Sequence, residues 1–228
     1  MSASLARVPS TISYEPISEN QSASYHLIFM ITGNPGLISY YTTFLSTLHI
    51  LLSAKKSNPD VFQIYGQSLA GFEQNDCPDP TTSVPYSLEA QIEILLQVLI
   101  EKSIPSGPRQ GRHYDSVILI GHSVGTYIIM EMLTRLRRTG STLKVKAGIL
   151  LFPTITHLAK SPSGVMVGSF FRIPAFPRAL SFVGKALLWP IPRPMLKFLA
   201  SKVLGMPEDS AETTARFLTS AIGIWQAL

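Results

Sequence analysis

A serine between two glycines offers the clearest chemistry in this sequence. The motif Gly-His-Ser-Val-Gly at 121–125 lies between a short apolar run and an amphipathic segment. In such a strand–turn–helix setting, small residues at Gly121 and Gly125 permit a tight turn, which holds Ser123 in a strained conformation with its hydroxyl exposed. The Val124 amide would then point at an oxyanion forming on an attacked carbonyl. We therefore expect Ser123 to be a nucleophile and Val124 to donate one oxyanion hydrogen bond.

A second turn could supply the other oxyanion donor. Gly-Asn-Pro-Gly at 33–36 follows the apolar run 25–32 directly. Proline has no N–H, so Pro35 cannot donate. The amide of Asn34 is the favoured candidate, followed by that of Gly36. The same four residues are also a good type I or II turn. The functional interpretation therefore depends on the occurrence of both motifs in the chain, with 33–36 before 121–125.

The acid and base that would activate Ser123 do not stand out. A hydrolase triad has the chain order Ser, Asp or Glu, His. After Ser123 the only Asp is Asp209 and the only His is His157, in the reverse order. No acid lies near His157 in the sequence, and a structural role is favoured for it, as packing is for His122. Our hypothesis is that the sequence is C-terminally incomplete, which would leave an apolar sheet edge exposed.

Apolar and amphipathic segments alternate along the first two thirds of the chain. We expect strands at residues 25–32, 61–66, 116–120 and 147–152. Helices are expected from Ser39, after the N-cap Ser87, and over 126–138. Nearly continuous apolar strands that alternate with helices are typical of a parallel sheet covered on both faces. The predicted fold class is therefore α/β.

Composition agrees with a folded domain. The chain has 228 residues, of which 46% are hydrophobic and only 14% charged, which excludes a disordered chain. Residues 1–15 lack an apolar core, so no secretory signal is predicted. The uncharged stretch 20–54 contains the turn at 33–36, which favours a strand, a turn and a helix over a membrane span.

A basic, apolar and proline-rich block occupies residues 161–207. Between Glu131 and Glu208 there is no acid, but there are twelve of the 19 basic residues. Phe, Leu, Trp and Pro lie between these charges, which favours a lipid surface over nucleic acid. The candidate lipid-facing residues are Arg172, Arg178, Lys185, Trp189, Arg193 and Lys197.

One helix of this block can be placed from its sequence. It begins at Arg193 and ends before Gly205. Its apolar face carries Leu196, Leu199 and Val203, and Lys197 lies on the basic face. The pattern fits a lid packed on the domain as well as it fits a membrane-binding helix, and a solvated basic face above an ordinary core is the third alternative.

Taken together, the motifs resemble the lipid droplet-associated hydrolase family of the α/β-hydrolase superfamily. The resemblance rests on five segments: GNPG at 33–36 with Tyr40-Tyr41, YSLEAQI at 86–92, GHSVGTYI at 121–128, LFPTI at 151–155 and SPSG at 161–164. It departs from the family at 68–72, which lacks the histidines often present there.

Membership would imply an α/β-hydrolase core over 1–160, a lid or lipid-binding insertion over 161–207, and one core helix, Ala211 to Leu228. It would also imply that Ser123 attacks a neutral lipid or sterol ester, without metal or cofactor, in an esterase of lipid storage. The protein would lie on lipid droplets and the cytosolic face of the endoplasmic reticulum. Two alternatives remain: a non-catalytic droplet-organising protein that retains the fold, and a cytosolic esterase whose proline-rich block is only a lid.

Overall fold

Within the described part of the chain, five strands form one sheet. The computed structural model describes residues 10–15, 22–54, 60–73, 85–155, 160, 162–173, 175–220 and 223–227. The strand order is β1-β3-β2-β4-β5. The strands are β1 (Thr11–Tyr14), β2 (Ser24–Ile31), β3 (Asp60–Gln67), β4 (Ser116–His122) and β5 (Val145–Leu151). All neighbouring strands are parallel except β1 and β3, so the predicted α/β class is confirmed, and so are the four predicted strands.

Strand β1 was not expected from the sequence. It has four residues and pairs antiparallel with β3, with Ile12 opposite Gly66. Only Ile12 is buried to the level of the core. A strand this short and this polar carries no recognisable alternation, and its pairing with β3 is what defines it.

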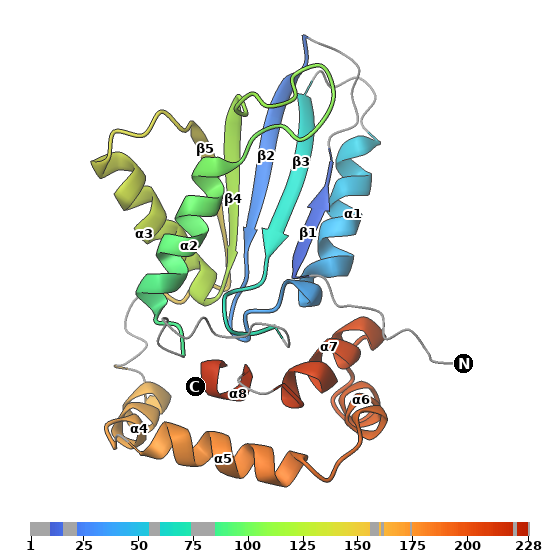
Figure 1. Ribbon diagram of the computed structural model, residues 1–228, viewed down its shortest axis with the longest axis vertical. Coiled ribbons are helices and arrows are strands. Elements are labelled where there is room, and N and C mark those ends of the chain that lie inside the picture. Colours follow the sequence, from blue (N-terminus) through green and yellow to red (C-terminus); the bar gives the residue numbers. More distant parts are fainter. Residues whose placement is uncertain are drawn as a thin grey trace.

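Alternate residues of β2 supply the two cores. Leu27 and Phe29 belong to the cluster that also contains apolar residues of α2 (Leu88–Glu101) and α3 (Val124–Arg138). Ile28 and Met30 lie on the opposite face with Leu45 of α1 (Thr42–Ser53). Both faces of the central strand are therefore covered, as Figure 1 shows.

The helix expected from Ser39 is in fact two elements. A 3-10 helix, η1 (Ile38–Tyr41), precedes α1, and the Thr42 hydroxyl donates to the Ser39 carbonyl at 2.9 Å. The N-cap predicted for the next helix is confirmed, because the Ser87 hydroxyl accepts a hydrogen bond from the Ala90 amide.

Five helices are described after the sheet, among residues 162–173, 175–220 and 223–227, and they lie beyond the carboxyl ends of its strands (Figure 1). They are α4 (Pro162–Phe171), α5 (Phe176–Leu188), α6 (Arg193–Lys202), α7 (Glu208–Leu218) and α8 (Gly223–Ala227). The proline-rich block is therefore made of short helices, and α6 confirms the helix predicted to begin at Arg193. Among the described residues, no helix is both long and apolar enough to cross a bilayer.

The single helix predicted from Ala211 to Leu228 is wrong. The structure has α7 and α8 instead, and α7 ends at its C-cap Thr219. The Thr219 hydroxyl donates to the carbonyls of Ala215 and Arg216, and the Ser220 amide donates to Phe217. Hydroxyl side chains that compete for backbone groups favour such an end. Helix α7 packs against α6 of the expected insertion (161–207) and also against η1 of the core. The domain boundary expected between residues 207 and 208 stays a prediction.

Strand β5 forms one edge of the described sheet. Ile149 lies opposite the buried Ile120 of β4, yet 44% of Ile149 is exposed. Ala147 and Gly148 are also exposed. The apolar edge expected from the sequence is therefore present among the described residues.

Candidate active site

Ser123 lies at the turn between β4 and α3. Its backbone has φ 50° and ψ −120°, the strained conformation that the sequence predicts for an elbow. The Ser123 side chain is partly exposed. Its amide donates to the Leu151 carbonyl at 2.9 Å, which ties the turn to the end of β5. Val124 is the first residue of α3, where an amide has no intrahelical acceptor.

Both glycines of the motif are required by close backbone approach. A Cβ on Gly121 would lie 2.7 Å from the Gly125 carbonyl oxygen. A Cβ on Gly125 would lie 2.5 Å from the Ile31 carbonyl oxygen, at the end of β2. Larger residues would separate the elbow from the strand beside it.

Thr126 is a supporting residue that the sequence analysis missed. It is fully buried, and its hydroxyl donates to the Ser123 carbonyl at 2.6 Å. The same hydroxyl accepts from the Thr154 amide at 3.2 Å. The first turn of α3 is therefore fixed to the loop after β5. No sequence signal distinguishes this threonine from others in helices.

The turn after β2 lies beside Ser123. A Cβ on Gly33 would lie 3.2 Å from the Ser123 Cβ. Asn34 is exposed, and its side-chain amide donates to the Ala227 carbonyl of α8 at 2.7 Å. Gly36 is buried, and a Cβ there would lie 2.5 Å from the Leu69 side chain. The choice of Asn34 over Gly36 as oxyanion donor stays a prediction.

The hydroxyl of Tyr41 connects this turn to the elbow. The Gly33 amide donates to the Tyr41 oxygen at 3.1 Å, and the same oxygen lies 3.0 Å from His122 Nδ1. Burial raises the pKa of Tyr41 above its usual value, although the Gly33 hydrogen bond opposes this. In the sequence, Tyr41 is one of two adjacent tyrosines, and no pattern distinguishes it from Tyr40.

His122 and Phe152 pack beside the elbow. The His122 ring meets the rings of Tyr41 and Phe152 edge-on, with centroids 5.7 Å apart in each pair. Phe152 has a positive φ of 48° and 79% of it is exposed. Phe152 is therefore an exposed aromatic residue on strained backbone beside the elbow.

After Ser123, the only His and the only Asp in the sequence are His157 and Asp209. His157 lies outside the described residues. Asp209 is in α7, where Thr43 of α1 donates to its carboxylate at 2.8 Å and lowers its pKa. Among the residues that the structure describes, none forms a hydrogen bond with the Ser123 hydroxyl.

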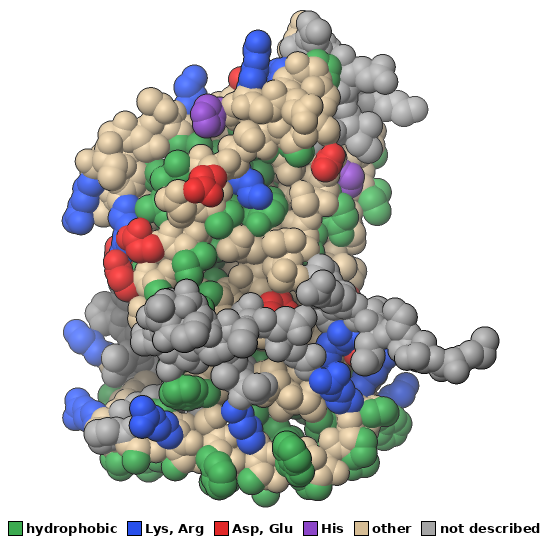
Figure 2. All heavy atoms as spheres, viewed as in Figure 1, with side chains coloured by type: hydrophobic (Ala, Val, Ile, Leu, Met, Phe, Trp, Pro, Cys, Tyr) green, Lys and Arg blue, Asp and Glu red, His purple; other side chains and the backbone are tan. Residues whose placement is uncertain are grey.

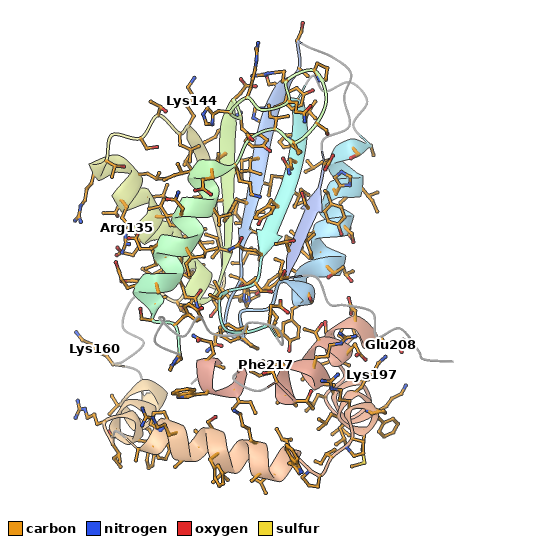
Figure 3. The ribbon with its side chains drawn as sticks, in the orientation of Figure 1. Arg135, Lys144, Lys160, Lys197, Glu208 and Phe217 are labelled. Carbon is orange, nitrogen blue, oxygen red and sulfur yellow. The ribbon has the colours of Figure 1, made fainter. Side chains whose placement is uncertain are left out.

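The six candidate lipid-facing residues have different environments. Arg172, Arg178 and Trp189 are exposed, Trp189 at 90%, while Lys185 is half-buried. Arg193 Nε donates to the Thr219 hydroxyl at 3.0 Å. Lys197 forms ion pairs with two glutamates of α7, one of them Glu208 at 3.4 Å (Figure 3).

The lipid-facing role of the six residues stays a prediction, and it includes Arg193, which is exposed, and Lys197, which is half-buried. The two side chains join α6 to α7, since α7 offers both a hydroxyl and carboxylates to the basic face of α6.

A strained serine between a parallel strand and a helix, beside a glycine turn after the neighbouring strand, defines an α/β-hydrolase fold. The crystal structure of juvenile hormone epoxide hydrolase from the silkworm Bombyx mori has this fold. It superposes with a TM-score of 0.58 at 13% identity, over 95% of this chain and 53% of that one.

The sequence comparisons identify the family. The model of the lipid-droplet associated hydrolase family matches residues 24–228. Lipid droplet-associated hydrolase of Mus musculus is 29% identical over 199 residues, which are 82% of this chain and 55% of the mouse protein. The Gallus gallus protein is 31% identical over 168 residues, 68% of this chain and 45% of the relative.

This chain therefore belongs to the lipid-droplet associated hydrolase family. It spans about half the length of the curated relatives that it matches.

Proposed function

We propose that this chain is a serine ester hydrolase of lipid esters, such as neutral lipid or sterol esters, and that it works at the surface of lipid droplets. The backbone of Ser123, with φ 50° and ψ −120° at the start of α3, is the observation that carries the proposal. In this geometry Ser123 Oγ attacks the ester carbonyl. The amides of Val124 and Asn34 hold the oxyanion that forms.

The rate of this reaction depends on how Ser123 is activated. An oxyanion hole and substrate binding alone sustain an acceleration of roughly 10³–10⁴ over water. A general base within hydrogen-bond reach of Ser123 Oγ supplies the rest. The proposal therefore concerns the nucleophile and the oxyanion donors, and it assigns no residue to the base or to its acid.

The outer surface of α4–α6 supports a lipid interface. Exposed apolar side chains line these helices: Val165, Met166, Phe170, Leu180, Phe182, Val183, Leu187, Met195, Phe198 and Leu199. Figure 2 shows that Lys and Arg side chains lie among the hydrophobic ones along this surface. Apolar groups with interspersed cations are typical of helices that lie in a lipid–water interface. The names of the relatives and this surface support a place on lipid droplets, and the proposal extends to the cytosolic face of the endoplasmic reticulum.

A fluorophosphonate probe tests the nucleophile. We expect the 228-residue chain to be labelled and Ser123→Ala to remain unlabelled. Ser169→Ala is the matched control, because Ser169 is exposed on α4 and bonds only the Val165 carbonyl of its own helix. Equal labelling of the wild type and Ser123→Ala would exclude Ser123 as the nucleophile.

The second candidate function is a non-catalytic protein that organises droplets. It is favoured by one observation, the lack of a hydrogen-bond partner for the Ser123 hydroxyl among the described residues. Imaging of droplets in cells separates the two functions. Droplet effects that persist in Ser123→Ala but vanish in the double variant Phe182→Asp, Trp189→Asp support the second; effects lost in Ser123→Ala support the first.

A further inference from the structure

Among the described residues, few groups join the turn at 33–36, here called the oxyanion turn, to the elbow at 121–125. Pairing between β2 and β4 ends at Ile31 opposite Gly121. Beyond this point, sheet hydrogen bonds no longer fix the turn at 33–36 relative to Ser123. The position of the Asn34 amide relative to Ser123 therefore depends on contacts between residues that follow β2 and the last pairs of the sheet.

Tyr41 makes such a contact with both loops at once. Its oxygen lies 3.1 Å from the Gly33 amide nitrogen and 3.0 Å from His122 Nδ1. Gly33 directly precedes Asn34, and His122 directly precedes Ser123. One hydroxyl thus connects the residue before the proposed oxyanion donor with the residue before the proposed nucleophile.

Gly33 and His122 lie in close contact. A Cβ on Gly33 would lie 2.6 Å from His122 Nδ1. The Gly33 N–H can only donate, so the Tyr41 oxygen accepts this hydrogen bond. When the phenolic proton is donated to His122 Nδ1, a neutral His122 carries its own proton on Nε2.

The neighbouring tyrosine provides a natural comparison. The Tyr40 hydroxyl bonds the Thr214 hydroxyl of α7 at 2.9 Å, away from the elbow. Both tyrosines belong to η1, both are half-buried, and burial raises the pKa of each. They differ in what their hydroxyl groups contact.

We infer that Tyr41 is a positioning residue that holds the oxyanion turn against the elbow and so sets the separation of the Asn34 amide and Ser123. The inference rests on the proposed function for its effect on rate, but not for its effect on structure. Misplacement of reacting groups by about 1 Å can cost on the order of 10²-fold in rate. Loss of the Tyr41 hydroxyl should therefore slow acylation of Ser123 without unfolding the protein.

The test compares Tyr41→Phe with Tyr40→Phe in the 228-residue chain. Amide hydrogen exchange at Gly33 and the ¹⁵N NMR signals of the His122 ring report on the bridge directly. In Tyr41→Phe we expect Gly33 exchange to rise at least about tenfold, because its acceptor is lost, and the His122 signals to move from the Nε2–H tautomer toward a mixture. In Tyr40→Phe both should match the wild type.

The rate of fluorophosphonate labelling is the second measurement. We expect it to fall roughly 10- to 100-fold in Tyr41→Phe and to stay unchanged in Tyr40→Phe. Unchanged Gly33 exchange and His122 signals in Tyr41→Phe would overturn the inference, and so would altered signals with an unchanged labelling rate. If the wild type itself is not labelled, the proposed function fails, and the exchange and NMR data alone decide whether Tyr41 holds the two loops.

Discussion

At the scale of single residues, the backbone of Gly125 lies directly against the end of β2. A Cβ at this position would be 2.5 Å from the Ile31 carbonyl oxygen and 2.7 Å from that of Thr32. The Ile31 carbonyl cannot move without disturbing the end of the pairing of β2 with its neighbours. We expect Gly125→Ala to lower the free energy of unfolding by about 1–3 kcal/mol, as overpacking does elsewhere. Urea denaturation followed by fluorescence measures this change.

Gly148→Ala is the control for that substitution. A Cβ on Gly148 would meet only the Ile129 side chain, at 3.8 Å, which is ordinary contact. The change in unfolding free energy should stay within about 0.5 kcal/mol. Equal destabilisation by the two variants would contradict the role given to the Gly125 contact.

Asp115 gives a second prediction at this scale, on pH. Hydrogen bonds from Arg109, and to a lesser extent from the Tyr25 amide, lower the pKa of Asp115 from 3.8 to about 2. A folded pKa below the unfolded one stabilises the fold above the unfolded value, and this contribution is lost as the pH falls through the folded value.

Asp115→Asn should therefore destabilise the protein near pH 7, and the difference from wild type should shrink between pH 4 and pH 2. The effect should be small, because 41% of the Asp115 side chain is exposed and the ion pair is screened by solvent. Urea denaturation at a series of pH values measures it, and a difference that grows toward pH 2 would contradict the assignment.

At the scale of elements, Gln226 is one of the residues that attach α8 to the core. Gln226 accepts from the Tyr86 amide at 2.7 Å and donates to the Tyr86 carbonyl at 2.9 Å. We expect Gln226→Ala to raise amide exchange at Tyr86 at least about tenfold, because both bonds join residues far apart in the chain. Gln97→Ala, on α2, is the control, since Gln97 bonds only Glu101 of its own helix. Unchanged exchange at Tyr86 would show that α8 is held by other contacts.

The edge strand β5 gives the other element-scale prediction. Ile149 and Ile120 are cross-strand neighbours, but only Ile120 is buried. Ile149→Lys should leave the unfolding free energy almost unchanged and reduce aggregation, because charges on an edge strand oppose edge-to-edge pairing. Ile120→Lys should prevent folding, since it buries an unpaired charge. Light scattering and circular dichroism distinguish these results, and an Ile149→Lys protein that does not fold would contradict the exposure of this edge.

At the scale of the whole molecule, the basic and apolar helices form an outer layer beyond the sheet (Figure 1). Contacts between η1, the loop after β3 and α7 attach this layer to the core. Among them are the Tyr40–Thr214 hydrogen bond and the stacking of the Phe72 and Phe217 rings, whose centroids are 6.4 Å apart. The surface proposed for lipid therefore faces away from the sheet.

Flotation with artificial triglyceride droplets coated with anionic phospholipid tests this surface. Each fully inserted aromatic side chain is worth about 1.5–3 kcal/mol, so Trp189→Ser should weaken binding by about tenfold or more. Leu51→Ser is the matched control, because Leu51 is 61% exposed on α1, outside the helical layer. Equal loss of binding in both variants would argue against a defined lipid-facing surface.

The sequence by itself determined the parallel strands, the helices between them, the Ser87 cap and the strained turn at Ser123. These features depend on local periodicity or on close backbone approach within a few residues, and both require residue types that can be recognised in the sequence. The tertiary structure alone decided that β1 pairs with β3, that Lys197 turns to α7, and that Tyr41 joins Gly33 to His122. Each of these depends on a partner distant in the sequence, and a hydrogen bond or ion pair between distant residues imposes no pattern on the segments that it joins.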